Sequence, residues 1–232
     1  MNGIIVAIDG PAASGKSTTA RRVAERLGYS HLNSGLLYRT VAWLGLRDGW
    51  VADEDRFAVE LSDTRLAMER RPPSFVVRAN GEIPGETLSA PQTAICASLV
   101  AARIDVRERV LDVLRAAGKS GGVACDGRDI GTVVFPGASL KVFLVASVEE
   151  RARRRVSEHG ITPDRQRLEL EIRRLEERDA RDSDRAHAPL VRAPDAIEID
   201  TTRLTPDEVV DQIVALAVER GARTVDDICD SV

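Results

Sequence analysis

The segment GPAASGKS at positions 10–17 constrains the fold of this chain more than any other part of its sequence. It matches the pattern G-x-x-x-x-G-K-[ST] at every fixed position. An apolar run, Ile4 to Ile8, precedes it and predicts a buried strand, and apolar residues at helical spacing follow it from Ala20 to Leu27. A strand, a glycine-rich loop and a helix in this order can surround a phosphate with backbone N–H groups at a helix N-terminus. The segment therefore predicts a nucleotide phosphate site.

The positions of this phosphate loop have expected roles in binding ATP. The glycines allow the backbone to curve around the phosphates, Lys16 reaches the β- and γ-phosphates, and the Ser17 hydroxyl binds Mg²⁺. A chance glycine turn with an exposed lysine is the alternative, and the flanking strand and helix disfavour it. The residues expected at the ATP phosphates are Gly10, Pro11, Ala12, Ala13, Ser14, Gly15, Lys16, Ser17 and Thr18.

The composition of the 232 residues is typical of a globular protein, with 43% hydrophobic and 30% charged residues and no apolar run near 18 residues. A net charge of −4 argues against general attraction to nucleic acids or membranes. The first residues lack the basic segment of a signal peptide. Three widely spaced cysteines, Cys96, Cys125 and Cys229, suggest neither a disulfide framework nor a zinc motif. These features predict a cytoplasmic protein that binds neither nucleic acid nor membrane.

Short apolar segments alternate with helical patterns along the rest of the chain. Besides Ile4 to Ile8, the predicted strands are Tyr29 to Leu32, Val123 to Cys125, Leu140 to Val145 and Ile197 to Asp200. This alternation predicts an α/β fold with a five-stranded parallel sheet and helices on both faces, in one domain over residues 1–232. Ligands of such a sheet bind at the carboxyl ends of the strands, where the phosphate loop, Ser34-Gly35 and Asp126 to Asp129 would meet.

Two segments are expected outside this sheet. Residues 68–91 contain prolines, a turn-forming Asn80-Gly81 pair and short β-like pieces such as Ser74 to Arg78, so they predict a small antiparallel excursion. Residues 151–185 predict a helical hairpin, because a capping sequence at Ser147 precedes one helix and apolar residues at helical spacing mark a second.

The residues Asp126-Gly-Arg-Asp129 form a dense polar cluster directly after a predicted strand. Its carboxylates could hold Mg²⁺ through water or accept hydrogen bonds from a base, and Arg128 could bind a phosphate with two nitrogens. A plain turn with internal salt bridges is the alternative. The mixed-charge run from Arg178 to Arg185 leaves two interpretations equally open: a solvated helix face, or arginines that neutralise a phosphoryl group during transfer. The GTPase motif N-K-x-D is absent from the sequence, so a small ATP-dependent kinase fits better.

Four segments together resemble the bacterial cytidylate kinase family: IDGPAASGKS at 8–17, SGLLYR at 34–39, DGRDIGTVVFP at 126–136 and RDSDRAHAPL at 181–190. The third is the most specific, since many families share the phosphate loop. The resemblance implies a P-loop nucleoside monophosphate kinase fold, with an acceptor-binding region at residues 34–117 and a helical lid at residues 151–185. It also implies Mg²⁺-dependent transfer of the ATP γ-phosphoryl group to CMP or dCMP. A kinase of this size whose site is complete in one chain is expected to work as a monomer.

The same resemblance implies the roles of individual residues. The residues expected at CMP are Ser34, Arg39, Ser98, Arg107, Arg128, Asp129, Arg178, Asp182 and Arg185. The residues expected to act on the transferring phosphate are Lys16, Arg128, Arg181 and Arg185, together with the arginines between positions 151 and 155, of which Arg155 would bind ATP phosphate. Asp129 also fits on chemical grounds, because a carboxylate accepts from the exocyclic amine of cytosine and repels the carbonyl of uracil.

Two features depart from the family pattern. Asn33 stands where relatives usually carry aspartate, and the excursion between Met68 and Gln92 is shorter and less regular. The nearest alternative function is a kinase of the same type for another small acceptor, such as UMP, AMP or shikimate. A second alternative is a regulatory module that binds ATP with negligible phosphoryl transfer to any monophosphate.

Overall fold

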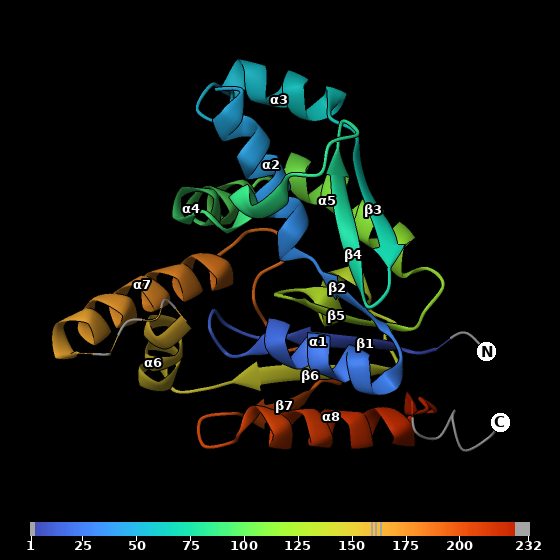
Figure 1. Ribbon diagram of the computed structural model, residues 1–232. Helices are drawn as coiled ribbons and strands as arrows, with labels where there is room; N and C mark the ends of the chain where they lie inside the picture. The colour runs from blue at the N-terminus through green and yellow to red at the C-terminus, as the bar shows by residue number, and fades with distance from the viewer. Residues whose placement is uncertain (1–2, 159, 161, 163, 226–232) are drawn as a thin grey trace.

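The computed structural model describes residues 3–158, 160, 162 and 164–225. A seven-stranded sheet runs through this described part in the order β3-β4-β2-β5-β1-β6-β7 (Figure 1). The strands are β1 (Ile5–Asp9), β2 (Ser30–Asn33), β3 (Leu66–Arg71), β4 (Ser74–Ala79), β5 (Val123–Gly127), β6 (Leu140–Val145) and β7 (Ile197–Asp200). The five predicted strands correspond to β1, β2, β5, β6 and β7, and they pair in parallel as predicted.

The predicted count of five strands is wrong, because the β3–β4 hairpin extends the same sheet. β3 and β4 pair antiparallel along their whole length, and β4 joins β2 through the single parallel pair His31↔Ser74. Phe75, Val77 and Ala79 of β4 are buried in the same core as α2 and α5. The hairpin therefore covers its apolar face and the open edge of β2 by joining the sheet.

The predicted Asn80-Gly81 turn is present, but it follows the hairpin instead of connecting its strands. It brings Ala79 and Glu82 together as an isolated antiparallel pair. The turn between β3 and β4 is formed by Pro72-Pro73, which lie between the end of β3 and the start of β4.

Helices cover both faces of the sheet, as predicted (Figure 1). They are α1 (Lys16–Leu27), α2 (Gly35–Arg47), α3 (Glu54–Asp63), α4 (Pro91–Val100), α5 (Ile104–Gly118), α6 (Val148–Glu158), α7 (Arg165–Ser183) and α8 (Pro206–Glu219), with a 3₁₀ turn η1 (Gly85–Ser89) and a π-helical turn η2 (Ile130–Val134). The side chains of β1 alternate between the two faces. Val6 and Ile8 pack with α1 and α8, whereas Ala7 packs in the core beneath α2 and α5.

The predicted helical hairpin is present as α6 and α7, and residues 159, 161 and 163 of the predicted segment lie outside the described part. Ala152 of α6 and Leu175 of α7 are buried in a small apolar cluster with Ala12 of the phosphate loop. This cluster joins the hairpin directly to the loop.

Two features bear on the predicted setting of the protein. Cys96 and Cys125 are buried free thiols, and Cys229 lies outside the described residues. No described helix combines the length and the apolar character needed to cross a membrane.

Candidate active site

The phosphate loop turns sharply between β1 and α1. Gly10 has a φ of 149°, and a Cβ at this residue would lie 2.2 Å from the Leu144 carbonyl oxygen, so a side chain does not fit there. Gly15 precedes the first residue of α1 with a φ of 89°, a left-handed conformation that glycine adopts without steric penalty. The first turn of α1 has N–H groups without intrahelical partners, and such groups bind phosphate.

Lys16 is a buried cation at the start of α1. Its ammonium group donates to the Pro11 carbonyl at 2.5 Å and to Ser14 Oγ at 3.3 Å. Burial and the nearby Arg128 guanidinium lower the pKa of Lys16 well below its usual value. Among the described residues Lys16 has hydrogen-bond acceptors but no carboxylate ion pair, so a bound phosphate would supply the missing negative charge.

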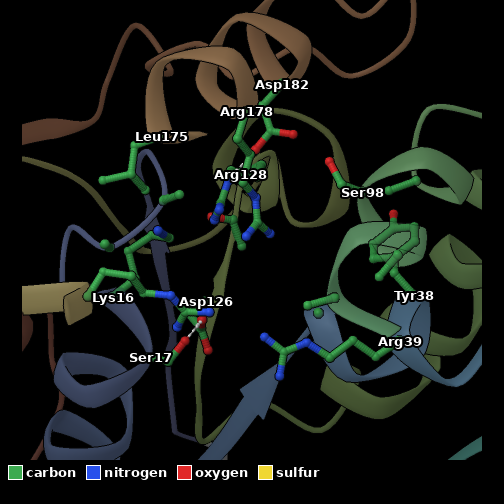
Figure 2. A pocket seen from close by; sticks show the side chains of 18 of the residues that line it. Lys16, Ser17, Tyr38, Arg39, Ser98, Asp126, Arg128, Leu175, Arg178 and Asp182 are labelled. Atoms are coloured by element: carbon green, nitrogen blue, oxygen red, sulfur yellow. Dashed lines mark hydrogen bonds and ion pairs between the residues drawn. The ribbon is translucent and has the colours of Figure 1, made fainter. Parts of the chain in front are cut away.

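Ser17 and Asp126 join α1 to β5 at the carboxyl edge of the sheet (Figure 2). Ser17 Oγ donates to Asp126 Oδ2 at 2.5 Å, and Asn33 Nδ2 lies 3.4 Å from the same hydroxyl oxygen. The described residues contain no cluster of three or more acidic, histidine or cysteine side chains that could hold a metal alone. A hydroxyl beside a carboxylate nevertheless fits Mg²⁺, since this ion is usually bound by one or two protein ligands together with substrate phosphates and water.

A cavity of about 760 Å³ opens in front of the phosphate loop, with residues of α4 and α7 among its walls. Six of the predicted arginines line it: Arg39, Arg128, Arg155, Arg178, Arg181 and Arg185. Burial and the neighbouring Arg128 lower the pKa of Arg178 to about 10. Among the described side chains, Arg178 Nε and Arg185 Nε are buried without a hydrogen-bond partner. Gathered cations with free donors create a site for an anion.

Asp182 holds two of these arginines in place. It is 1% exposed, and it accepts from Arg128 Nε at 2.8 Å and from Arg185 Nη2. Burial opposes the ionisation of Asp182, but the two guanidinium groups outweigh this effect and lower its pKa. The side chain of Arg185 is 6% exposed, so the interpretation of this run as a solvated face is wrong at Arg185.

The end of the cavity opposite Lys16 carries Ser98 and Tyr38 (Figure 2). Asp129 also lines the cavity, and Arg107 donates to its carboxylate and, at 3.1 Å, to the Ala101 carbonyl. Burial raises the pKa of Asp129 despite this contact. Ser98 Oγ is buried and has no partner among the described residues. This end therefore offers a carboxylate and an unpaired hydroxyl to a polar ligand.

Most of the predicted residues meet in this one cavity. Those that line it are Ala12, Ala13, Gly15, Lys16, Ser17, Thr18, Ser34, Arg39, Ser98, Arg128, Asp129, Arg155, Arg178, Arg181, Asp182 and Arg185. Gly10, Pro11 and Ser14 belong to the loop but are not part of the lining, and Arg107 acts on the cavity through Asp129.

The arginines of α6 differ in what they contact. Arg155 lines the cavity, whereas Arg153 pairs with Glu150 at 2.9 Å on the surface. Arg151 is buried, where it pairs with Asp179 of α7 and donates to the Ala12 carbonyl at 3.1 Å. Of these arginines Arg155 lines the cavity, Arg151 joins α6 to α7 and the phosphate loop, and Arg153 stays on the surface of its own helix.

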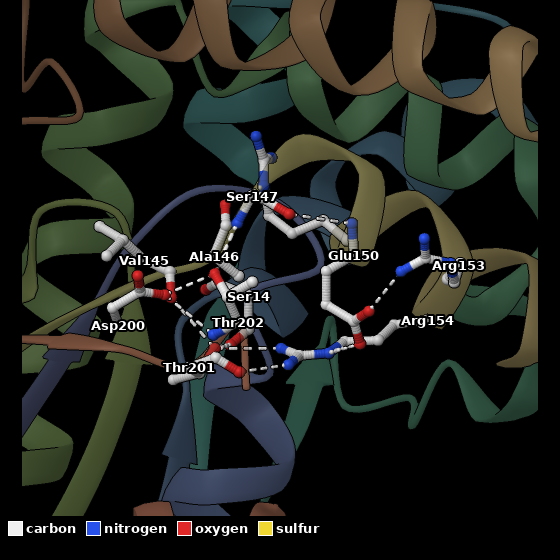
Figure 3. A network of polar contacts seen from close by, with 11 residues as sticks. Ser14, Val145, Ala146, Ser147, Glu150, Arg153, Arg154, Asp200, Thr201 and Thr202 are labelled. Carbon is white, nitrogen blue, oxygen red and sulfur yellow. Dashed lines mark hydrogen bonds and ion pairs between the residues drawn. The ribbon is translucent and has the colours of Figure 1, made fainter. Parts of the chain in front are cut away.

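Arg154 connects α6 to the loop that follows β7 (Figure 3). It donates to Glu150 at 3.1 Å, to Thr201 Oγ1 at 3.1 Å and to the Thr201 carbonyl at 2.6 Å. Thr201 Oγ1 donates in turn to the Val145 carbonyl at 3.0 Å and lies 3.5 Å from the Ser14 carbonyl. This network holds α6, the end of β6 and the phosphate loop in one arrangement.

Analysis of the sequence missed two polar residues that shape the site. Asp9 accepts from the N–H groups of Ile130 and Gly131 at 2.9 and 2.7 Å, and burial raises its pKa to about 6. The sequence did contain a signal for Asp9, because this acidic residue stands between an apolar strand and the glycine-rich loop. His31 Nε2 lies 2.7 Å from Asp126 Oδ1, and no local pattern marked it, because its partner is 95 positions away.

Comparisons with known proteins agree with this geometry. A family model described as cytidylate kinase matches residues 6–219. The cytidylate kinase of Anoxybacillus flavithermus is 47% identical over 221 residues, which cover 94% of this chain and 97% of the relative. That of Geobacter sulfurreducens is 43% identical over 223 residues, which cover 96% of each chain. A crystal structure of an uncharacterized protein from Eubacterium ventriosum, 14% identical, shares the fold with a TM-score of 0.51 over 93% of this chain and 98% of that chain. The chain therefore belongs to the cytidylate kinase family.

Proposed function

We propose that this chain transfers the γ-phosphoryl group of ATP to CMP and dCMP, in a reaction that requires Mg²⁺, and forms CDP and dCDP. The observation that carries the proposal is the layout of one cavity. The phosphate loop lies at one end, Ser98 lies at the opposite end, and Asp129 and a group of arginines complete the lining. Membership of the cytidylate kinase family supports the same activity.

The donor end of the cavity would hold the phosphates of ATP. The loop N–H groups and Lys16 would bind these phosphates, and Arg155 would contact them from α6. Ser17 and Asp126 would hold Mg²⁺, which would neutralise charge on the phosphate oxygens.

The acceptor end would hold the nucleoside monophosphate. Asp129 would accept from the exocyclic amine of cytosine, and Ser98 would add a hydrogen bond to the base. The remaining residues would contact the sugar and phosphate: Ser34, Arg39, Arg128, Arg178, Asp182 and Arg185. Arg107 would fix the Asp129 carboxylate in place.

The reaction needs no covalent nucleophile and no dedicated base, because the attacking phosphate oxygen of the acceptor is already an anion. The chain would accelerate the in-line transfer by position and charge. Lys16, Arg128, Arg181 and Arg185 would stabilise negative charge in the transition state. Residues 34–117 would form the acceptor-binding region, and the hairpin at 151–185 would act as a lid that excludes water, which otherwise competes as acceptor.

A coupled assay of nucleoside diphosphate formation tests this proposal, with Mg-ATP as donor and CMP, dCMP, UMP, AMP and GMP as acceptors. We expect turnover mainly with CMP and dCMP. Faster turnover of UMP or AMP would refute the cytosine assignment. Binding of ATP without transfer to any acceptor would favour the regulatory module.

We also propose that the enzyme works as a monomer in the cytoplasm. The proposed donor and acceptor residues all occur in this chain, so catalysis would need no partner subunit, and the two described cysteines are free thiols, as in reducing compartments. Light scattering coupled to size-exclusion chromatography should give a mass near 25.2 kDa. A stable dimer would contradict the first part of this proposal.

A further inference from the structure

His31 does not line the cavity, yet it contacts a residue that orients Ser17. Along β2 the half-buried His31 and Asn33 alternate with the buried Ser30 and Leu32, so His31 and Asn33 share one face of the sheet. Asp126 of the neighbouring β5 is in register with Asn33. The three polar side chains therefore gather on one face, beside the first turn of α1.

The Asp126 carboxylate is shared between two partners. Its Oδ1 lies 2.7 Å from His31 Nε2, and its Oδ2 accepts from Ser17 Oγ at 2.5 Å. A carboxylate only accepts hydrogen bonds, so His31 donates through Nε2 and is the neutral tautomer with that proton or the imidazolium. The side chains of His31 and Asp126 are 11% and 6% exposed, so bulk water competes weakly for these bonds.

These two hydrogen bonds determine how the Ser17 hydroxyl is oriented. Because its O–H is directed to Asp126, Ser17 Oγ keeps its two lone pairs as acceptors, and the long contact from Asn33 leaves at least one of them to bind a cation. The terminal torsion of an aspartate has a broad energy well, so the carboxylate would rotate more freely without the contact to His31. Asn33 does not replace this contact, because its long 3.4 Å interaction reaches the Ser17 oxygen and not the carboxylate.

We propose that His31 is a positioning residue for Mg²⁺. It acts through Asp126 to hold the Ser17 hydroxyl in the orientation that binds the ion of the Mg²⁺–nucleotide complex. This inference rests on the proposed function, because it requires nucleotide phosphates at the loop. Removal of a residue that orients a metal ligand typically lowers metal affinity by roughly 10- to 100-fold.

The test measures binding of a non-hydrolysable ATP analogue by calorimetry, once with excess Mg²⁺ and once with EDTA. The ratio of the two dissociation constants is the Mg²⁺-dependent gain in affinity. His31→Leu lacks the donor and should reduce this gain by about tenfold or more, while affinity in EDTA stays the same. His31→Gln can still donate a hydrogen bond and should restore most of the gain.

Tyr29→Phe is the matched control. It removes one hydrogen bond just before the start of β2, where the Tyr29 hydroxyl accepts from the Ile4 N–H at 3.1 Å and does not contact Asp126, so it should leave the gain unchanged. His31→Asn has a shorter side chain that reaches less far toward Asp126, so it should act like His31→Leu. It replaces His31→Leu in the test if His31→Leu does not fold.

Two outcomes would overturn the inference alone. One is an undiminished Mg²⁺-dependent gain in His31→Leu or, if that variant does not fold, in His31→Asn. The other is an equal loss of affinity with and without Mg²⁺, which indicates general damage to the loop. A wild-type protein that binds the analogue equally in Mg²⁺ and EDTA would overturn the proposed Mg²⁺ site as well.

Discussion

Asp129→Asn should change the base selectivity of the enzyme more than its rate. The substitution keeps the shape of the side chain but replaces a carboxylate, which only accepts, with an amide that accepts and donates. Asp129 is 4% exposed and paired with Arg107, so its hydrogen bond to the cytosine amine would form in a buried site. A hydrogen bond to a charged group contributes about 1.5–3 kcal/mol. The substitution also removes the repulsion between the Asp129 carboxylate and the uracil carbonyl, so it should favour UMP and lower the preference for CMP further.

At 1.4 kcal/mol per factor of ten, we expect the ratio of kcat/KM for CMP over UMP to fall by about 10- to 150-fold. The assay is coupled ADP formation with each acceptor at concentrations well below KM. Asp182→Asn is the control. Asp182 contacts Arg128 and Arg185, which we propose bind the acceptor phosphate, so this substitution should lower kcat/KM for both acceptors by a similar factor. A CMP/UMP ratio that stays within threefold of the wild type in Asp129→Asn would refute this account of base recognition.

Three further predictions concern the phosphate loop and the strand before it. Lys16→Ala should lower kcat by roughly 10²- to 10³-fold while CMP binding stays measurable, and near-normal turnover would contradict the role of this cation. Gly10→Ala should lower the free energy of unfolding in urea by about 2 kcal/mol or more, since its Cβ would meet the Leu144 carbonyl at 2.2 Å, whereas Gly49→Ala, with nothing within 4 Å of the new Cβ, should lose clearly less. Burial raises the pKa of Asp9 from 3.8 to about 6, so the folded chain binds this proton more readily than the unfolded chain. Protonated Asp9 therefore stabilises the folded chain. This contribution is at its maximum below about pH 4 and is lost as the pH rises through 6. At 1.36 kcal/mol per pKa unit, the unfolding free energy of the wild type minus that of Asp9→Asn should fall by roughly 3 kcal/mol over this range, and a constant difference would contradict the raised pKa.

Local patterns were sufficient to predict the centre of the fold. The glycine loop, the apolar strand before it and the amphipathic helix after it each depend on residues close in sequence, and all three are present. The cluster from Asp126 to Asp129 was predicted at a strand end because the apolar run Val123 to Cys125 stops before it, and β5 does end within this cluster, at Gly127. The same logic failed for the β3–β4 hairpin, since its union with β2 rests on the single pair His31↔Ser74 and on packing against distant helices.

The sequence alone also could not distinguish the arginines of α6 from one another. Arg151, Arg153, Arg154 and Arg155 are the same residue type on one helix, so their composition predicts the same role for each. The packing of Ala152 and Leu175 against Ala12 sets the rotation of this helix. As a result Arg155 lines the cavity, Arg151 is buried against Asp179, and Arg153 lies at the surface.

The sequence by itself determined the parallel α/β core and the phosphate loop, because the conformation of a glycine turn and the burial of an apolar strand are encoded by near neighbours. Most of the other site residues were predicted from the resemblance to a known family. Only the tertiary structure decided which polar groups meet across the sheet. The contacts from Asp9 to the turn after Asp129 and from His31 to Asp126 join residues about a hundred positions apart. Such contacts depend on strand order and register, which no local pattern of residues specifies.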